Sequence, residues 1–312
     1  MMTQKICAVV VTFNRKHLLL RTLNALNNQS VKLDKIILVD NASTDGTSEL
    51  LREQGFLAQT NLEYVQFTEN TGGAGGFYTG VKAGFEQDFD WLWLMDDDGY
   101  PADDCLESLL KYQDEFDFYG PLVLSDEDKH TLSFPITLPQ NKKIMRHYTQ
   151  LGGYYDLQNN VMEDVLIPFN GVLLKKTLIE KIGFPDSRFF IWGDDMEYTK
   201  RAKTVGAKIA TLFDVVFYHP TAPNLGTPMF FGKMQFNDTD SMIKLYCLCR
   251  NNTYNLKKYH SPLHALLFMV KTCWFYGFTR PSMTKLKFCL PALWHGWRAD
   301  FSHHRSFIGK NF

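Results

Sequence analysis

The sequence predicts an α/β fold in which a mostly parallel sheet is flanked by helices, with a helical appendage at the C-terminal end. Strand and amphipathic helix signals alternate through the first 125 residues, which is the rhythm of a parallel sheet with helices on both faces. The 312 residues are 45% hydrophobic, enough for one large core or a core with an appendage. Charge is uneven, because residues 241–312 hold 11 Lys or Arg and one acidic residue, whereas the rest of the chain carries the acidic excess.

The elements of the alternating part follow in order. Residues 5–13, KICAVVVTF, are a continuous apolar run typical of a buried strand, and the next helix carries Leu19, Leu23 and Leu26 at helical spacing. A second strand is expected at residues 35–40, and STDGTSELLRE after it opens with residues that cap helices. The series ends with a strand at 62–67, a glycine-rich turn with the helix FYTGVKAGFEQ, and a strand at 90–95.

The middle of the chain is less regular. Residues 126–162 mix proline, glycine and polar residues and indicate loops and short strands along one side of the sheet. Residues 165–183 indicate a strand pair or a strand followed by a helix, and residues 194–206 a helix ended by Gly206. AKIATL and VVFYHP indicate two late strands, and residues 221–236 have the composition of a mobile loop beside a site.

Three consecutive carboxylates, Asp96, Asp97 and Asp98, end an apolar strand. Ligands of such sheets bind at the carboxyl ends of the strands. A calcium loop is excluded, because it needs a glycine at the sixth position, where Pro101 stands. A helix cap needs only one carboxylate, for which Asp98 would suffice. Mg²⁺ or Mn²⁺ held together with diphosphate oxygens accounts for all three, so the pattern predicts a metal–diphosphate site.

Two further strand ends are polar or rich in glycine. ENTGGAGGFYTG (69–80) lacks the dinucleotide pattern G-x-G-x-x-G, because Tyr78 stands at the sixth position from Gly73. Its glycines fit either a backbone packed close to a ligand or tight helix–sheet packing. Asp40 is placed to accept the N3–H of uracil or thymine, with Thr12 and Arg15 near the base or phosphate, or it only caps the next helix.

A second acidic cluster opens the helix expected at 194–206. Asp194, Asp195 and Glu197 lie at its start, where the helix dipole favours ionised carboxylates, and the aromatic residues before them suit stacking on a sugar. This combination favours a catalytic role over a solvated helix start. His219 ends a late strand, where it is either structural or a nitrogen ligand to the cation.

Together these segments resemble the inverting glycosyltransferases of family 2, which have the GT-A fold. The resemblance covers roughly residues 5–260 and rests on VVVTFNR, ILVDNASTDGT, NTGGAGGF, WLWLMDDDGYP, FFIWGDDMEY and FYHP in the family's order. Within the family the motifs look most like bacterial galactofuranosyltransferases and next like rhamnosyltransferases. The resemblance implies a GT-A catalytic domain at 1–240, with a nucleotide-binding half (1–125) and an acceptor half (126–240), followed by the basic, aromatic helical region at 241–312.

The resemblance also implies roles for the matched positions. Asp195 would be the general base, with Asp194 as the competing candidate. The metal ligands would be Asp96, Asp98 and His219. The nucleotide-sugar donor would be bound by Thr12, Asn14, Arg15, Asp40, Asn70, Gly72, Gly73, Asp96 and Asp97. The acceptor would be bound by Asn170, Gly171, Trp192 and Glu197. Gly193 separates Trp192 from the Asp pair, a departure from the family pattern that leaves the position of this tryptophan open.

The expected reaction is metal-dependent transfer, with Mn²⁺ or Mg²⁺, of galactofuranose from its UDP donor to a lipid-linked surface polysaccharide or O-antigen acceptor. Rhamnosyl transfer from a dTDP donor is the alternative enzyme, since both pyrimidines share the N3–H. A non-catalytic sugar-nucleotide-binding protein is the alternative of another class, and the second acidic cluster argues against it because binding alone does not need these carboxylates.

The C-terminal region and the cysteines suggest where the chain acts. Residues 241–312 hold 14 aromatic residues in amphipathic segments suited to a membrane interface; a packed helical subdomain or a dimer contact is the alternative, and no nucleic-acid-binding motif is present. Neither a signal pattern nor a run of 18 apolar residues occurs. Six scattered cysteines indicate buried thiols in a reducing compartment. We therefore expect a cytoplasmic protein, peripheral on the inner face of the cytoplasmic membrane.

Overall fold

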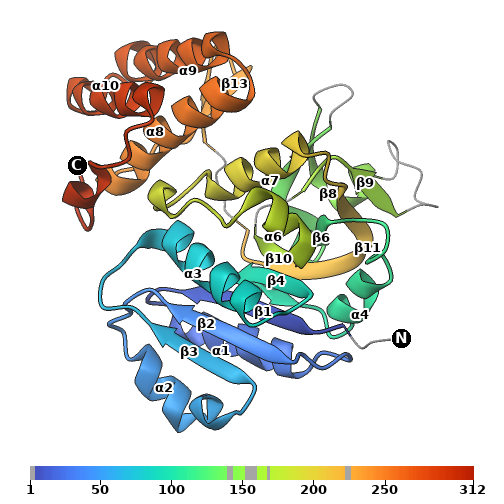
Figure 1. The fold of residues 1–312 in the computed structure, drawn as a ribbon. Coiled ribbons are helices and arrows are strands. Elements are labelled where there is room, and N and C mark those ends of the chain that lie inside the picture. The colour runs from blue at the N-terminus through green and yellow to red at the C-terminus, as the bar shows by residue number, and fades with distance from the viewer. Residues whose placement is uncertain (1–3, 139–142, 152–159, 167–168, 222–225) are drawn as a thin grey trace. The chain divides into compact units, whose positions relative to one another are not determined.

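The computed structural model describes residues 4–138, 143–151, 160–166, 169–221 and 226–312. The chain divides into two compact units (Figure 1). The first comprises Met1–Pro185 with Arg201–Thr221, and the second comprises Asp186–Lys200 with Ala222–Phe312.

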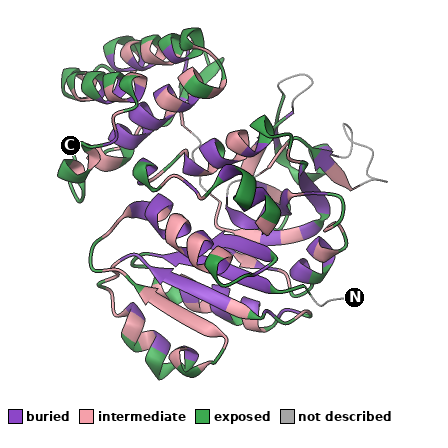
Figure 2. Cartoon of the chain, viewed as in Figure 1, coloured by how far each residue is buried: buried purple, intermediate pink, exposed green. Residues whose placement is uncertain are grey.

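The first unit begins with the predicted alternation of strands and helices, which is confirmed. Its elements are β1 (Ile6–Thr12), α1 (Lys16–Asn27), β2 (Lys35–Asp40), α2 (Thr47–Glu53), the 3₁₀ turn Phe56–Ala58, β3 (Leu62–Gln66), α3 (Gly72–Glu86) and β4 (Trp91–Asp96). The four strands lie in the order β3-β2-β1-β4 and are all parallel. Figure 2 shows that β1, β2 and β4 are buried, whereas the edge strand β3 is only partly so.

Alternate side chains of β1 meet helices on opposite faces of the sheet. Ala8 and Val10 belong to the same core cluster as Leu19 of α1. Val9 and Val11 point the other way, as the period of two requires, and contact α3. A Cβ atom added at Gly76 would lie 2.4 Å from Val11 Cγ1, and one at Gly80 would lie 2.3 Å from Val9 Cγ1. The glycines at this spacing therefore permit close helix–sheet packing.

The second half of this unit extends the sheet with mixed strand directions. Its elements are β5 (Tyr100–Pro101), α4 (Cys105–Leu110), β6 (Phe118–Ser125), β7 (Thr131–Thr137), β8 (Ile144–His147), α5 (Tyr148–Leu151), β9 (Val161–Glu163), β10 (Asn170–Lys175), α6 (Lys176–Ile182) and β11 (Ile209–His219). The order continues β4-β10-β6-β11-β5; β6 and β11 are parallel, and the other neighbours in this series are antiparallel. The two predicted late strands form one strand with an irregularity between Leu212 and Val216.

The second unit is mainly helical. Its elements are the 3₁₀ turn Ser187–Phe189, the first turns of α7 (Asp194–Thr204), β12 (Thr227–Met229), β13 (Met234–Phe236), α8 (Met242–Tyr259), α9 (Pro262–Trp274), the π-helical turn Phe275–Thr279, α10 (Met283–Arg298) and the 3₁₀ turn His304–Phe307. A hairpin of β12 and β13 occupies most of the loop predicted at 221–236, of which residues 222–225 lie outside the described residues.

The cysteines are free thiols, and Cys273 is the one that is not fully buried. No helix among the residues that the structure describes is long and apolar enough to cross a membrane.

Candidate active site

The carboxyl ends of β1, β2 and β4 lie side by side in the first unit. Thr12 is paired in register with Asp40, and Val11 with Asp96. The polar residues that follow these strands are therefore brought to one edge of the parallel part of the sheet, as predicted from the strand ends.

Asp97 is 2% exposed and accepts hydrogen bonds from several groups of the β1–α1 segment. Its Oδ2 accepts from Thr12 Oγ1 at 2.6 Å and from Phe13 N at 3.2 Å. Its Oδ1 lies 3.1 Å from Arg15 Nη1. Burial raises the pKa of Asp97, and Arg15 and the hydrogen bonds act against that rise. Asp97 thus fixes the loop after β1, and its predicted contact with the donor stays a prediction.

Asp98 faces His219, the last residue of β11. Asp98 Oδ1 lies 3.1 Å from His219 Nε2, yet this buried oxygen accepts no hydrogen bond of normal geometry. His219 Nδ1 lies 2.7 Å from the carbonyl oxygen of Pro220. Because a carbonyl only accepts, Nδ1 donates its hydrogen there, and Nε2 is the nitrogen that faces Asp98 and would bind a cation once it carries no proton.

The Asp98–His219 pair therefore fits a divalent cation. A carboxylate oxygen and an imidazole nitrogen converge on one place, and the other nitrogen of the imidazole is held by a backbone carbonyl, as is usual for a histidine that binds a metal. Arg15 Nη1 lies 2.6 Å from Asp98 Oδ2. Burial alone would raise the pKa of Asp98, but His219 and Arg15 outweigh it and lower that pKa. Within the described residues Asp96 does not join the pair in a three-ligand cluster, and its part in metal binding stays a prediction.

Asp40 is fully buried and already bonded to protein groups. Its Oδ1 accepts from Ser43 N at 2.8 Å and its Oδ2 from the Tyr64 hydroxyl at 2.5 Å. Burial, followed by the bond to Asp40, raises the pKa of Tyr64 well above its ordinary value. The bond to Ser43 closes a local turn and is not the helix cap that the sequence left open, because the N-cap of α2 is Gly46, without a side-chain hydrogen bond. Recognition of a pyrimidine by Asp40 remains a prediction.

The other predicted donor residues order the loops at this edge. Asn14 N donates to Ser43 Oγ at 2.9 Å, and Asn14 Oδ1 accepts from Thr44 N at 2.7 Å. Asn70 Oδ1 accepts from Gly72 N at 2.8 Å, and Gly72 has a φ of 74°, which favours glycine. A Cβ atom at Gly73 would meet nothing within 4 Å. Gly73 therefore lies beside open space, unlike Gly76 and Gly80, which pack against the sheet.

Asn170 and Gly171 begin β10, next to β4. Asn170 is buried, and the Gly171 carbonyl accepts from Trp93 Nε1 at 2.8 Å. Gly171 has a φ of 78°, and a Cβ atom there would lie 2.6 Å from Phe217 Cδ2. Glycine is needed here for backbone conformation and packing, and contact of these two residues with an acceptor stays a prediction.

In the second unit, Asp194, Asp195 and Glu197 occupy the first turn of α7, where its N-terminus was predicted. Asp194 is buried, and this burial, together with the charge of Asp195, raises its pKa to about 8. Asp195 is partly exposed, its Oδ1 accepts from Met196 N at 2.6 Å, and burial raises its pKa as well. Of two adjacent carboxyl groups the more buried one holds a proton more readily, so Asp195 is the member that carries the charge.

Glu197 differs from these two because it contacts one lysine and one tyrosine of α8. It is 1% exposed, Lys258 Nζ lies 3.1 Å from its Oε1, and the Tyr259 hydroxyl donates to the same oxygen. Trp192 is 40% exposed and has a φ of 63°. An exposed indole is available for stacking, whereas Glu197 is engaged within the unit; the acceptor contacts predicted for both stay predictions.

Residues of α8 that hold this segment were not predicted from the sequence. Asn251 Nδ2 lies 2.7 Å from the Trp192 carbonyl oxygen and 3.0 Å from that of Ile191. Asn255 Nδ2 donates to the Gly193 carbonyl at 2.8 Å, and Arg250 Nη2 to that of Phe189 at 2.7 Å. The signal was available: polar residues of CRNNTYN stand at positions where the helix is buried, and buried polar groups need partners.

Comparisons with known proteins show the family to which the chain belongs. Residues 7–165 match the family described as "Glycosyl transferase family 2". The chain is 30% identical over 261 residues to Galactofuranosyltransferase GlfT1 of Mycolicibacterium smegmatis, covering 82% of this chain and 84% of that protein. It is 31% identical over 263 residues to GlfT1 of Mycobacterium tuberculosis H37Rv, with the same coverage.

Solved structures show the same fold. S. aureus TarS 1-349 in complex with UDP-GlcNAc has a TM-score of 0.55 at 16% identity, over 97% of this chain and 90% of that chain. GalNAc-T7 with UDP, GalNAc and Mn2+ has a TM-score of 0.55 at 14% identity, over 90% of this chain and 58% of that chain. With the family match and the relatives at 30% identity or above, the chain belongs to glycosyl transferase family 2 and is a glycosyltransferase of GT-A fold.

Proposed function

We propose that this enzyme transfers galactofuranose from UDP-galactofuranose, with inversion and in the presence of Mn²⁺ or Mg²⁺, to a lipid-linked glycan such as an O-antigen or another surface polysaccharide. The GlfT1 relatives support the sugar, because they match over four fifths of the chain. Neighbours of the same fold are named as complexes with UDP, UDP-GlcNAc and Mn2+, which supports a nucleotide-sugar donor and a divalent cation.

The observation that carries the proposal is the convergence of Asp98 and His219 at the strand ends. A divalent cation at these two residues would neutralise the charge that develops on the departing diphosphate. Arg15 offers a second positive group at the same place, since it pairs with both Asp97 and Asp98. The polar loops that begin at Asn14, Asp40 and Asn70 are proposed to bind the nucleotide and the donor sugar.

Asp195 is proposed as the general base. Being the charged member of the Asp194–Asp195 pair, it can take the proton of an acceptor hydroxyl as that oxygen attacks C1 of the sugar. Attack from the face opposite the diphosphate inverts the anomeric centre. Asp194 is the competing candidate, but its raised pKa keeps it protonated at neutral pH.

Peripheral membrane binding through the helical region is part of this proposal. Exposed apolar side chains recur at helical spacing along α9 and the turn after it: Leu263, Leu266, Leu267, Val270, Trp274 and Phe278. Figure 2 shows that many residues of α9 and α10 are exposed. The 11 basic residues and one acidic residue of the region 241–312 suit an anionic lipid surface. An apolar helix face with basic flanks is the usual form of an interfacial helix.

A donor panel tests the proposed reaction. Purified full-length enzyme with Mn²⁺ is incubated with UDP-galactofuranose, UDP-galactopyranose or dTDP-rhamnose and a lipid-linked glycan acceptor, and release of the nucleoside diphosphate is measured. We expect turnover with UDP-galactofuranose. Turnover confined to dTDP-rhamnose would establish the rhamnosyltransferase alternative, and binding of a donor without turnover of any would favour a sugar-nucleotide-binding protein.

A further inference from the structure

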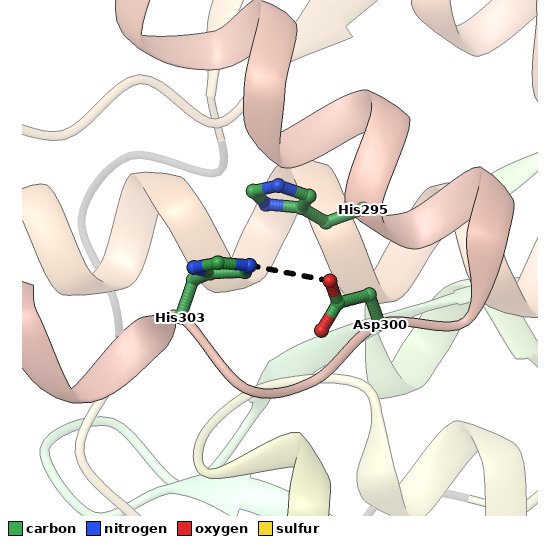
Figure 3. A group of neighbouring side chains, drawn as sticks. All are labelled: His295, Asp300 and His303. Atoms are coloured by element: carbon green, nitrogen blue, oxygen red, sulfur yellow. Dashed lines mark hydrogen bonds and ion pairs between the residues drawn. The ribbon is translucent and has the colours of Figure 1, made fainter.

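A cluster of metal-ligand side chains lies in the second unit, outside the candidate active site. Each of His295, Asp300 and His303 offers one ligand atom, and these atoms lie within 4.8 Å of one another (Figure 3). Among the described residues, no other group of three or more His, Cys, Asp or Glu side chains has its ligand atoms this close together. Two imidazoles and one carboxylate within nine residues make a compact ligand set.

The end of α10 brings the three residues together. Ala299 follows the helix with a φ of 57°, so the chain turns back on itself. Asp300 N donates to the His295 carbonyl at 2.8 Å and Ala299 N to that of Gly296 at 3.3 Å. This turn places Asp300 beside the last turn of the helix, and three residues later His303 stacks on His295, with ring centroids 4.2 Å apart and planes 13° apart.

Two of the three side chains, Asp300 and His295, are oriented by bonds at a second polar atom. Asp300 Oδ1 accepts from Ser302 Oγ at 2.7 Å and from Ser302 N at 3.0 Å. Its Oδ2 lies 3.2 Å from His303 Nε2. His295 Nδ1 lies 2.7 Å from the hydroxyl of Tyr246, a buried residue of α8, which leaves Nε2 of His295 to the cluster. Bonds of this kind at the non-ligating atoms hold His295 and Asp300 in place. His303, which is half exposed, would turn out of its stack on His295 to direct a ring nitrogen at a shared ion.

The chemistry of the donor set points to zinc. Two imidazole nitrogens and one carboxylate oxygen are ligands that Zn²⁺ takes at about 2.0–2.2 Å, with a water in the fourth position. Asp300 is the single acidic residue among residues 241–312, and it stands between the two histidines. The Asp98–His219 pair is a different site in the other unit, so the two can be separated by substitution.

We propose that His295, Asp300 and His303 form a zinc site that fastens the C-terminal turn to α10. Residues beyond the turn are already connected to α8: His304 Nδ1 lies 3.1 Å from Arg250 Nη1, and the Phe307 and Tyr246 rings are 5.0 Å apart between centroids. Zinc at the cluster stabilises the helical unit, because it binds the folded arrangement and holds the segment that closes against α8.

Metal titration of the full-length protein tests this site. The chelator-treated protein is titrated with Co²⁺, whose visible absorption reports tetrahedral nitrogen and oxygen ligands, and with Zn²⁺ against a chromophoric chelator. We expect about one equivalent of zinc, and His303→Ala and Asp300→Asn are expected to weaken its binding roughly tenfold or more. His264→Ala, an exposed histidine of α9, should leave this binding unchanged. In His219→Ala, which removes a ligand of the other proposed cation site, the equivalent lost with His303→Ala should remain.

Thermal unfolding supplies a second readout that is independent of transfer activity. Zinc should raise the unfolding temperature of the wild type and of His264→Ala, but not that of His303→Ala. If wild type and His303→Ala bind zinc equally, or if the wild type takes up none at about a hundredfold excess, the cluster is an ion pair of His303 and Asp300 and the proposal is overturned.

Discussion

Asp194 and Asp195 are adjacent carboxyl groups that differ in burial, and this difference assigns their protonation. The raised pKa of Asp194, about 8 against an ordinary 3.8, means that the folded protein binds a proton where the unfolded chain has released it. The stabilisation that Asp194 contributes to the folded state is therefore fully present at a pH below its ordinary pKa, and it is lost as the pH rises towards 8. Near neutral pH Asp194 is the neutral member, and Asp195 carries the charge that a base needs.

The first prediction compares two conservative substitutions. Asp195→Asn should reduce transfer by roughly 10²–10⁴-fold, because the acceptor hydroxyl loses its base, while UDP affinity is unchanged. Asp194→Asn resembles the protonated form of that residue and should retain most of the activity at pH 7. The measurement is kcat for transfer together with calorimetric UDP affinity. An active Asp195→Asn enzyme would place the base elsewhere.

Side-chain roles at this scale were predictable where they follow from a strand end or a helix start. The positions of Asp98, His219 and Asp195 were expected in this way, and their roles stay predictions. Other bonds join residues that are distant in sequence: Thr12 to Asp97, Tyr64 to Asp40, and Asn251 to the backbone of residues 191–192. A single sequence does not indicate which distant residues meet.

At the scale of elements, α3 shows how a glycine run serves two purposes. This helix was predicted to begin at residue 77, because a glycine-rich run is typical of a turn. In the structure it begins at Gly72. Helical propensity is overridden here by packing, since Gly76, Gly80 and Gly84 let α3 approach the sheet more closely than any side chain allows. The mixed direction of the later strands could not be predicted from the sequence either, because a short apolar run does not indicate whether its neighbours in the sheet are parallel or antiparallel.

The second prediction tests this packing. Gly80→Ala should destabilise the protein by about 1–3 kcal/mol, because its Cβ would lie 2.3 Å from Val9 Cγ1. Gly73→Ala is the matched control in the same helix, since its Cβ meets nothing within 4 Å, and it should be neutral or slightly stabilising. Chemical denaturation of both variants measures the difference. Equal stability would show that close helix–sheet contact is not what requires glycine at position 80.

At the scale of the whole molecule, the sequence predicted a catalytic α/β domain and a basic helical region, and the structure contains an α/β unit and a helical unit. The grouping of residues 186–200 with the helical unit was not predictable, because it rests on buried polar bonds from α8. The excess of basic residues and the exposed apolar face of α9 both lie in the second unit.

The third prediction concerns that apolar face. Leu267→Glu and Val270→Glu replace side chains that are 58% and 62% exposed, so folding should be preserved while binding to anionic vesicles falls severalfold. Val205→Glu, at a residue 46% exposed in the first unit, is the control and should bind like the wild type. Co-sedimentation with vesicles of anionic lipid measures this. Unchanged sedimentation of the α9 variants with a change in oligomeric state would instead mark the face as a contact between copies of the chain.

The account depends most on the claim that Asp98 and His219 hold the cation that binds the donor diphosphate. The direct measurement is UDP affinity by titration calorimetry, with and without Mn²⁺, for the wild type, for His219→Ala and for His147→Ala, an exposed histidine of β8. We predict that Mn²⁺ strengthens UDP binding to the wild type and to His147→Ala by about tenfold or more, and that His219→Ala loses this gain. An equal Mn²⁺-dependent gain in His219→Ala would contradict the account.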